Sequence, residues 1–419
     1  MTNEVFEIVG GNKLNGTIKV QTSKNAVLPI VAATIITPGV FKILDCPNIV
    51  DLKNMLTILE TFGAKIEKDQ TGYIIDTKEI DITKLDCELC KTMRSSLFLL
   101  GSMLARFGKA IITEPGGCKI GARPIDLHLK SLKHLGVKIT EVGDKIYFDS
   151  SHAHAGKVKL KLPSVGATEN LVEFACKLKG KTTICNAAKE PEVVDLCNFL
   201  NKMGAKIVGA GTDKITIYGV NSLYPVVYKP ISDRIVAGTI MCGVALCGGD
   251  VVLTNVLAEH NMDLITKLQL MGCKITYNNN TIHIVSRGKL HALNYIETGY
   301  FPAFPTDEQS LMLVCSCLAS GQTEIKEHIF ENRFLTLPEL KKMGANVLQK
   351  DKNSVTIIGV RELYAQNLTA MDLRGGASLV LAGLVAKGKT TISNVGYIDR
   401  GYDGIETMFA LLGANIKRV

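Results

Sequence analysis

The sequence is poor in aromatic residues and contains no tryptophan. Aromatic residues make up 6% of the 419 residues, and no dense block of Lys and Arg occurs, although the formal net charge is +8. A nucleic-acid surface normally combines a concentrated basic patch with aromatic side chains that stack on bases. We therefore expect no nucleic-acid partner, and the modest positive charge favours small anionic molecules instead.

Long apolar segments are also lacking. No apolar run approaches the roughly 20 residues that a membrane-spanning helix needs, so we expect no membrane association. The first residues, MTNEVFEIVGG, lack the basic and apolar regions of a secretion signal. The 12 cysteines are spread along the chain, and many lie in apolar segments such as IMCGVALCGG, which is typical of reduced, buried thiols. We expect a cytoplasmic protein.

Motifs for common cofactors and metals are missing as well. There is no Walker A motif and no G-x-G-x-x-G fingerprint. Cys87 and Cys90 form a single C-x-x-C, without the second pair that a structural zinc site needs. His152 and His154 could share one face of a strand, but no third ligand is evident. We expect neither a metal nor a cofactor.

An internal repeat is the main organising feature of the sequence. A glycine, a small residue and the start of an apolar strand recur about every 70 residues, at Gly63, Gly136, Gly204, Gly272, Gly344 and Gly413. A second series of glycines opens other strands with the same spacing, at Gly39, Gly108, Gly180, Gly249, Gly321 and Gly388. Each unit reads as strand, apolar helix, strand, amphipathic helix and strand hairpin. The sequence therefore predicts an α/β protein of six β-α-β-α-β-β units.

Six units of this length divide naturally into two domains of three. No linker rich in Pro or Ser marks the boundary, which we place near Tyr228–Pro230, where the fourth unit is expected to begin. The strand around residues 16–20 immediately precedes the first helix of the first unit.

Cationic side chains recur at the start of the first helix of a unit. They are Lys24, Arg94, Arg234 and Arg374. A cation at a helix N-terminus opposes the macrodipole by about 0.3–1 kcal/mol, whereas a bound anion would reverse the effect. The pattern favours an anion-binding cleft between the two domains. As an alternative, some of these cations could pair with Asp233, Glu308 or Asp372, which could also act as helix N-caps.

One cysteine differs from the others in its surroundings. Cys118 lies in EPGGCKIGARPID, residues 114–126, among a proline and two glycines that suit a mobile, exposed loop. Lys119 and Arg123 follow closely, and nearby cations lower the pKa of a thiol. The loop predicts a thiol that takes part in chemistry.

Several motifs, spread in order over essentially the whole chain, resemble one family. They are SKNAVLPIVAA, TMRSSLFLLGSMLARFG, EPGGCKIGARPIDLHL, LPSVGATENL, FPTDEQS, IFENRF, LRGGASLVLAG and YIDRGYD. In these segments the chain resembles the UDP-N-acetylglucosamine 1-carboxyvinyltransferases, which belong to the enolpyruvyl transferase superfamily. The resemblance implies transfer of enolpyruvate from phosphoenolpyruvate to the 3′-hydroxyl of UDP-N-acetylglucosamine, with release of phosphate. This is the first committed step of peptidoglycan synthesis and proceeds by addition and elimination through a tetrahedral ketal.

The resemblance also implies a fold and a domain division. The family fold consists of two inside-out α/β barrel domains, each of three β-α-β-α-β-β repeats, which agrees with the six units. The chain crosses between the domains twice, so that residues 21–229 form one domain and residues 1–20 plus 230–419 form the other. The resemblance implies no oligomeric partner.

Residue roles follow from the matched motifs. Cys118 would be the proton donor and could form a covalent adduct, and in the family fosfomycin alkylates the cysteine at this position. Asp307 would be the base for the 3′-hydroxyl. Lys24 and Arg400 would also take part in catalysis. The residues implied in binding phosphoenolpyruvate are Lys24, Asn25, Arg123, Arg333, Arg374 and Arg400. Those implied in binding the nucleotide sugar are Arg94, Arg123, Pro124, Ile125, Asp126, Leu127, Ser164, Val165, Asp307 and Ile329.

The chain departs from the family at one position. Some members carry a lysine where this sequence has Leu162, with Lys161 beside it. A direct lysine contact to the uridine end is therefore not implied for this chain.

Two other functions remain open. The sister enzyme that acts on shikimate 3-phosphate would share the Lys and Arg residues, but it gives no reason for the Pro-Gly-Gly-Cys loop. A non-catalytic anion-binding paralogue would fit the positive charge. The joint presence of Lys24, Cys118, Asp307 and Arg400 argues against it.

Overall fold

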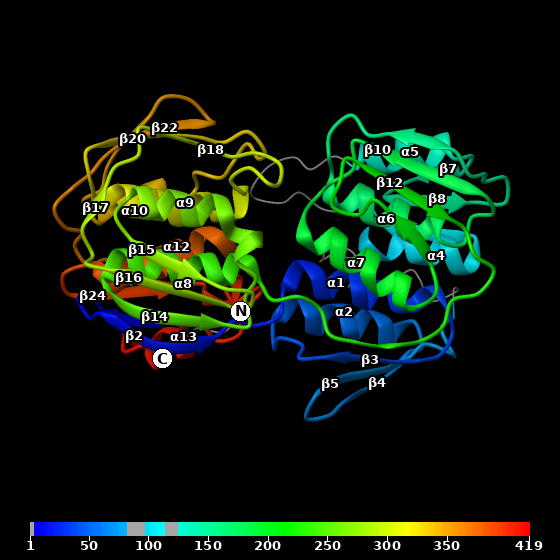
Figure 1. Cartoon of the computed structure of the whole chain (residues 1–419), viewed down its shortest axis with the longest axis horizontal. Coiled ribbons are helices and arrows are strands. Elements are labelled where there is room, and N and C mark those ends of the chain that lie inside the picture. The colour runs from blue at the N-terminus through cyan, green and yellow to red at the C-terminus, as the bar shows by residue number, and fades with distance from the viewer. Residues whose placement is uncertain (1–3, 82–96, 114–124) are drawn as a thin grey trace. The chain divides into compact units, whose positions relative to one another are not determined.

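The computed structural model describes residues 4–81, 97–113 and 125–419 (Figure 1). The predictions for Cys87, Cys90, Arg94, Cys118, Lys119, Arg123 and Pro124 fall outside these residues. The described residues form two compact units. We call residues 22–81, 97–113 and 125–231 the central unit, and residues 4–21 and 232–419 the terminal unit. Each unit has a hydrophobic core of its own.

The central unit contains three described sheets. The first has the strand order β13 (Val227–Tyr228), β3 (Val40–Leu44), β5 (Gly72–Asp76), β4 (Lys65–Lys68). The second has the order β6 (Lys109–Thr113), β8 (Lys145–Asp149), β7 (Lys138–Val142). The third has the order β11 (Lys206–Val208), β12 (Lys214–Tyr218), β10 (Lys181–Cys185), β9 (Lys157–Lys159). Its helices are α1 (Lys24–Ala33), the 3₁₀ helix η1 (Thr34–Ile36), α2 (Val50–Thr61), α4 (Leu99–Phe107), α5 (Asp126–His134), α6 (Val165–Ala175) and α7 (Pro191–Lys202).

The terminal unit contains three four-stranded sheets and one small ribbon. The first sheet has the strand order β15 (Lys274–Tyr277), β16 (Thr281–Ser286), β14 (Gly249–Thr254), β2 (Leu14–Lys19), and the second has the order β18 (Tyr295–Glu297), β20 (Gln322–Lys326), β22 (Ser354–Ile358), β21 (Asn346–Gln349). The third sheet has the order β23 (Asn367–Thr369), β24 (Lys389–Ser393), β1 (Phe6–Val9), β25 (Asn415–Arg418). The ribbon consists of β17 (Leu290–His291) and β19 (Ala319–Ser320). The helices are α8 (Arg234–Cys247), η4 (Ala258–Asn261), α9 (Met262–Leu270), η5 (Thr306–Glu308), α10 (Gln309–Leu318), α11 (Leu337–Lys342), α12 (Leu373–Val385), η6 (Val395–Tyr397) and α13 (Ile405–Leu411).

The four-stranded sheets share one topology. In the sheet of β9, for example, β9 is parallel to β10, which is antiparallel to β12, which in turn is antiparallel to β11. Helix α6 connects the parallel pair and α7 leads to the hairpin, so the order is β-α-β-α-β-β, the order that the glycine series predict. The result is a mixed α/β fold.

The glycines of both series have a common backbone conformation. All twelve have positive φ, such as 107° at Gly63 and 133° at Gly249, a region that L side chains rarely adopt. Gly249 also begins β14 against β2, where a Cβ atom would lie 1.8 Å from the Leu14 carbonyl oxygen. The series therefore mark the points where a helix ends or where a strand approaches its neighbour closely.

Strand pairing departs from chain order at the N-terminus. Strand β2, which precedes α1 in the chain, lies parallel to β14, with Leu14 opposite Gly249. The short strand β13 lies instead beside β3, with Val227 opposite Lys42. Strand β1 joins the last sheet, between β24 and β25. The glycine spacing contains no information on this exchange.

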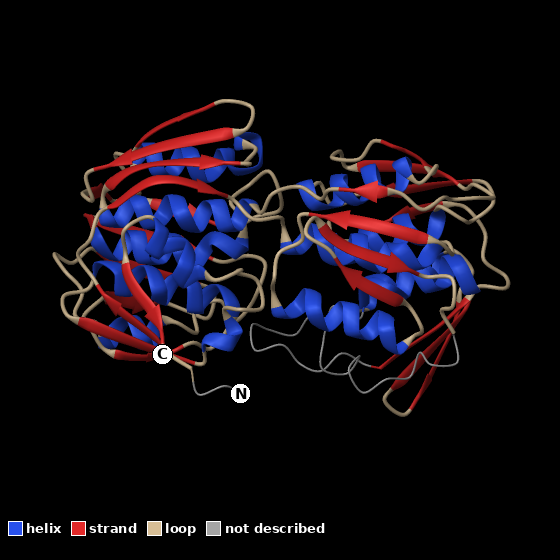
Figure 2. Ribbon diagram, turned by 90° about the horizontal axis from the view of Figure 1, so that it is seen from below, coloured by secondary structure: helices blue, strands red, loops and turns tan. Residues whose placement is uncertain are grey.

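In each unit, helices lie between the sheets (Figure 2). In the terminal unit α8, α10 and α12 pack against one another and are buried along almost their whole length. A helix that is apolar on all sides requires such a position. No helix of the described residues has the length and hydrophobicity needed to cross a bilayer.

Candidate active site

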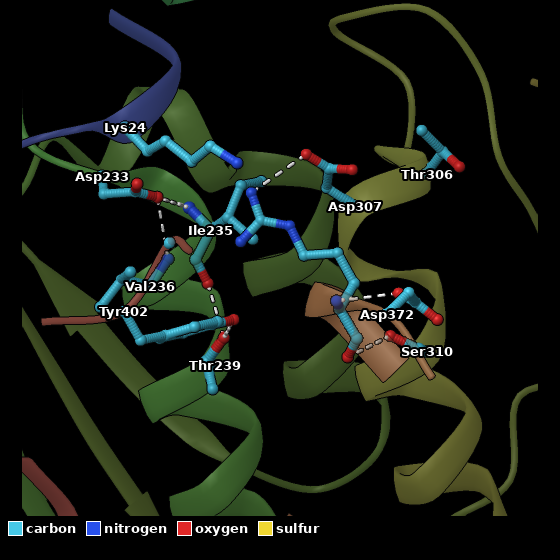
Figure 3. Close-up of polar contacts among 12 residues, drawn as sticks. Lys24, Asp233, Ile235, Val236, Thr239, Thr306, Asp307, Ser310, Asp372 and Tyr402 are labelled. Atoms are coloured by element: carbon cyan, nitrogen blue, oxygen red, sulfur yellow. Dashed lines mark hydrogen bonds and ion pairs between the residues drawn. The ribbon is translucent and has the colours of Figure 1, made fainter. Parts of the chain in front are cut away.

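Polar residues that the sequence analysis singled out lie at the N-termini of α8, α10 and α12 in the terminal unit. Asp233 caps α8, accepting hydrogen bonds from Ile235 N (2.9 Å) and Val236 N (3.0 Å) (Figure 3). Asp372 caps α12 in the same way through the backbone N–H groups of Arg374 and Gly375, both at 3.0 Å. These two aspartates satisfy helix N–H groups, as the N-cap alternative predicts.

Asp307 joins two buried guanidinium groups. Its Oδ2 lies 3.2 Å from Arg374 Nη2, and its Oδ1 forms an ion pair with Arg333 Nη2. The side chains of Arg333 and Arg374 are almost fully buried, whereas that of Asp307 is 24% exposed. Burial alone would lower the pKa of Arg374, but the Asp307 carboxylate raises it above its ordinary value. Two guanidinium groups thus share one carboxylate.

Further contacts hold Arg374 in place. Its guanidinium carbon lies 5.9 Å from the centroid of the Tyr402 ring, and the Tyr402 hydroxyl lies 2.7 Å from Thr239 Oγ1. Ser310 Oγ donates a hydrogen bond to the Arg374 carbonyl at 3.0 Å (Figure 3). Arginine above an aromatic face gains cation–π stabilisation when it is desolvated. The side chain is therefore fixed before any ligand binds.

The structure describes two further predicted residues in the terminal unit. Ile329 donates its backbone N–H to Glu327 Oε1 at 2.7 Å and is half-buried. Arg400 is half-buried and follows η6, next to Asp399, which pairs with Arg418 at 2.6 Å.

Glu308, beside Asp307, is a buried carboxyl group. Burial raises its pKa from 4.5 to about 8, while Arg234 lowers it. Its Oε1 accepts a 3.4 Å hydrogen bond from Asn261 Nδ2. It lines a small cavity of about 30 Å³ together with Arg234 and Phe301. Arg234 is buried and lies 5.7 Å from the centroid of the Phe301 ring.

In the central unit Lys24 is paired with an acidic residue that the sequence analysis missed. Lys24 is the first residue of α1, and its Nζ lies 2.7 Å from Asp51 Oδ2 in the first turn of α2. Asn25 follows on α1 and is half-buried. The signal for Asp51 was only its place at the start of a predicted helix, where an acidic residue is common.

The nucleotide-sugar candidates of the central unit occupy neighbouring helix N-termini. Ser164 caps α6 through a 3.4 Å bond from Ala167 N, and Val165 begins the helix. Asp126 begins α5 and pairs with Lys130 at 2.9 Å, which holds its pKa below the ordinary value. Its neighbours are the buried Ile125 and Leu127, which packs on the core.

The two helices meet at these ends. A Cβ atom at Gly166 of α6 would lie 3.3 Å from His128 Cε1 of α5. The structure therefore brings the two predicted segments of the sugar site together. Leu162, where some family members carry lysine, is exposed.

The nine described cysteines are free thiols that are buried or half-buried. Burial raises the pKa of the Cys46, Cys197 and Cys317 thiols to about 12. Thiols of this kind are poor nucleophiles at neutral pH. Cys242, Cys315 and Cys317, which lie in the apolar segments, are packed in the core of the terminal unit, as predicted.

Comparison with known proteins decides the family. The family model described as EPSP synthase (3-phosphoshikimate 1-carboxyvinyltransferase) matches residues 8–409. UDP-N-acetylglucosamine 1-carboxyvinyltransferase 2 of Caldanaerobacter subterraneus is 43% identical over 99% of both chains. The UDP-N-acetylglucosamine 1-carboxyvinyltransferase of Halothermothrix orenii is 44% identical, also over 99% of both chains. The chain belongs to the UDP-N-acetylglucosamine 1-carboxyvinyltransferase family. The resemblance noted in the sequence motifs is thereby confirmed.

Solved structures show the same fold at lower identity. The enolpyruvyl transferase NikO from Streptomyces tendae superposes with a TM-score of 0.88 at 24% identity, covering 100% of this chain and 99% of that chain. EPSP synthase from Acinetobacter baumannii gives a TM-score of 0.74 at 18% identity, with 100% of both chains covered. The mixed α/β fold of the 1-carboxyvinyltransferase family therefore extends to these more distant enzymes.

Proposed function

We propose that this protein transfers the enolpyruvyl group of phosphoenolpyruvate to the 3′-hydroxyl of UDP-N-acetylglucosamine and releases phosphate. The observation that carries this proposal is 43% identity over nearly the full length to enzymes named for that reaction. The reaction would be the first committed step of peptidoglycan synthesis and would take place in the cytoplasm.

We assign the two compact units to the two domains of the family. Residues 21–229 and residues 1–20 plus 230–419 would each form an inside-out α/β barrel of three repeats. Separate hydrophobic cores and the placement of β1 and β2 in sheets of the terminal unit support this division.

The phosphoenolpyruvate anion would bind to cationic groups. We assign its binding to Lys24, Asn25, Arg123, Arg333, Arg374 and Arg400. Two buried guanidinium groups share the single carboxylate of Asp307, and an added phosphate or carboxylate would give them a second anionic partner. Bidentate guanidinium groups suit these planar and tetrahedral anions. Fixed cations also cost no reorganisation when phosphate leaves.

The acid and base of the addition are assigned to Cys118 and Asp307. Cys118 would deliver a proton to the methylene carbon of phosphoenolpyruvate, while the sugar oxygen forms a bond to the adjacent carbon and its proton passes to Asp307. The resulting tetrahedral ketal then loses phosphate together with a proton from the new methyl group. The product is the enol ether of the sugar.

The pairing of Asp307 suggests how substrate binding activates the base. A carboxylate between two guanidinium groups is a weak base, because the positive charges stabilise its ionised form. When substrate anions take up that positive charge, the carboxylate regains basicity at the moment when the 3′-hydroxyl is present. Binding and proton transfer would in this way be coupled.

The nucleotide sugar would bind to helix N-termini and their flanking segments. We assign it to Arg94, Arg123, Pro124, Ile125, Asp126, Leu127, Ser164, Val165, Asp307 and Ile329. The contact between α5 and α6 at Gly166 and His128 supports the grouping of the central-unit members. Helix N-termini present free N–H groups to phosphate oxygens.

The decisive test mixes the protein with phosphoenolpyruvate and UDP-N-acetylglucosamine and follows inorganic phosphate. Phosphate release that depends on both substrates is expected. Shikimate 3-phosphate, offered as the acceptor in a parallel reaction, should give none. The absence of release beside an active reference enzyme would reject the proposal, and release with shikimate 3-phosphate would assign the sister reaction.

A further inference from the structure

Glu327 is a buried acidic residue to which neither the motifs nor the proposed mechanism assigns a role. It directly follows β20, and its side chain is only 1% exposed. Thr298 directly follows β18, which pairs in parallel with β20 so that Glu297 lies opposite Lys326. Both residues therefore stand at the carboxyl ends of adjacent parallel strands, the edge where α/β sheets carry their ligand sites.

The two carboxylate oxygens of Glu327 serve two different parts of the chain. Oε1 accepts hydrogen bonds from Thr298 Oγ1 (2.9 Å) and from the backbone N–H groups of Ile329 (2.7 Å) and Phe330 (3.1 Å). Oε2 accepts a hydrogen bond from Thr306 Oγ1 at 2.9 Å. Both oxygens of this buried carboxyl group are thus supplied with hydrogen-bond donors, as a buried polar group requires.

The Oε2 branch leads directly to the charged cluster. Thr306 Oγ1 donates its proton to Glu327 and accepts a 3.1 Å hydrogen bond from Arg333 Nε. Arg333 then pairs with Asp307, the residue after Thr306. The Thr306 hydroxyl has a single proton, and donating it to Glu327 fixes the direction of the oxygen lone pairs, one of which accepts from Arg333.

The Oε1 branch fixes a different feature. It ties the turn at Ile329 and Phe330 to the end of β18, and Thr298 Oγ1 also accepts the backbone N–H of His328 at 2.9 Å. The Phe330 ring lies 5.1 Å from the guanidinium carbon of Arg333, so the two branches meet again at that arginine.

We propose that Glu327 is a positioning residue that orients Arg333 for the phosphoenolpyruvate anion through Thr306, and separately holds the Ile329 turn for the nucleotide sugar. The inference rests on the proposed functions of Arg333, Asp307 and Ile329. Glu327 is buried, and it would act only through the residues to which it is hydrogen-bonded. A single buried carboxylate thus sets the geometry of two substrate contacts.

Glu327→Gln separates the two branches. In the variant, the amide oxygen of the glutamine takes the place of Oε1, because that position faces three hydrogen-bond donors. The amide NH₂ group therefore takes the place of Oε2 and points at Thr306. The Thr306 oxygen then meets two donors and its own proton loses its acceptor, which disturbs the bond to Arg333. We expect the KM for phosphoenolpyruvate to rise about tenfold, with a smaller change in the KM for the nucleotide sugar.

Companion variants test each branch. Thr306→Val should reproduce the rise in KM for phosphoenolpyruvate, and Thr306→Ser, which keeps the hydroxyl, should restore the original value. Thr298→Val removes a bond of the Oε1 branch only and should raise the KM for the nucleotide sugar instead. The double variant Glu327→Gln, Thr306→Val should be no worse than either single variant, because both remove the same bond.

Thr323→Val is the matched control. Thr323 lies on β20, is equally buried, and its hydroxyl has no hydrogen-bond partner among the described residues. This variant should leave both KM values unchanged. Its thermal unfolding, measured beside that of the other variants, distinguishes loss of a buried hydroxyl in general from loss of the Glu327 network.

The outcomes separate this inference from the proposed function. If the unaltered protein releases no phosphate, the proposed function fails. If it is active but Glu327→Gln and Thr306→Val lower only stability and leave the KM for phosphoenolpyruvate unchanged, Glu327 has no positioning role. Additive effects in the double variant would also overturn the proposal. Parallel titrations of phosphoenolpyruvate binding by calorimetry should show the same pattern as the KM values.

Discussion

Lys24 and Asp51 form an ion pair of 2.7 Å in which the two side chains are 12% and 4% exposed. The pair joins the first residue of α1 to the first turn of α2 within the central unit. Removing one partner of a buried ion pair is costly, since the other charge keeps its desolvation penalty.

Asp51→Asn should therefore lower the free energy of unfolding by about 3 kcal/mol. It should also tighten the binding of inorganic phosphate, because the Lys24 cation is no longer paired with the Asp51 carboxylate. Urea unfolding and calorimetry provide the two measurements. Asp69→Asn is the control, since it breaks the more exposed pair with Lys42 and should have little effect. An unchanged free energy of unfolding in Asp51→Asn would show that the ion pair does not stabilise the fold.

Glu308 should make the stability of the terminal unit depend on pH. Burial raises its pKa from 4.5 to about 8 in the folded protein. The folded state therefore binds the proton more tightly than the unfolded state. The stability from this group is fully present below about pH 4.5 and is lost as the pH rises through 8.

Glu308→Gln tests this dependence, because the amide is neutral at every pH. Urea unfolding at pH 5, 7 and 9 should show a decline for the unaltered protein and a flatter profile for the variant. Equal slopes in the two proteins would mean that Glu308 is ionised in the folded state already at neutral pH.

The hydrogen bond between Tyr228 and Asp195 should strengthen as the pH rises. Tyr228 Oη donates to Asp195 Oδ1 at 2.6 Å, and Ile231 N donates to Oδ2 at 3.0 Å. Burial raises the pKa of Asp195 to about 6, although these two bonds lower it. Above pH 6 the carboxylate is ionised and the bond is charge-assisted.

Tyr228→Phe should consequently cost about 1.5–3 kcal/mol at pH 8 and less at pH 5. The same unfolding experiment on Tyr224→Phe, at an exposed tyrosine, should show no pH-dependent loss. A loss for Tyr228→Phe that is identical at both pH values would indicate that Asp195 does not titrate in this range.

Fosfomycin should label Cys118 and no other cysteine. The family resemblance assigns the reaction to this loop, and the described cysteines are buried or half-buried, several with raised thiol pKa values. Peptide mapping by mass spectrometry identifies the labelled site. Cys118→Asp should escape labelling yet retain turnover, because a carboxylic acid can still donate a proton. A label on Cys46 or Cys185 would contradict the placement of the reactive thiol.

Much of the local structure could be predicted from the sequence. The two glycine series mark turns with positive φ, and the aspartates before Arg234 and Arg374 are helix caps, as their residue types indicate. The buried arginines at helix N-termini were visible as repeated exceptions to the macrodipole rule. Their partners were not, since the Arg374 guanidinium group pairs with Asp307, whereas Asp372, two residues earlier, accepts the Arg374 backbone N–H as the helix cap.

Residues that act through long-range contacts could not be found in this way. Glu327 follows a strand and precedes a histidine, which in sequence resembles an ordinary solvent-exposed strand end. Its hydrogen-bond partners are Thr298, which follows β18, and Thr306, which begins η5, both more than 20 residues earlier in the chain. Asp51 and Asp195 are likewise common helix residues until their partners are known.

The sequence by itself determined the repeat order, the helix caps and the family, because each depends on neighbours along the chain or on motifs preserved in order. Only the tertiary structure decided that β2 joins β14 and that β13 completes the sheet of β3, and that Asp307 lies between two arginines. The physical reason is that strand pairing and burial of charge are set by groups far apart in the chain, whose contacts have no local signature in the sequence.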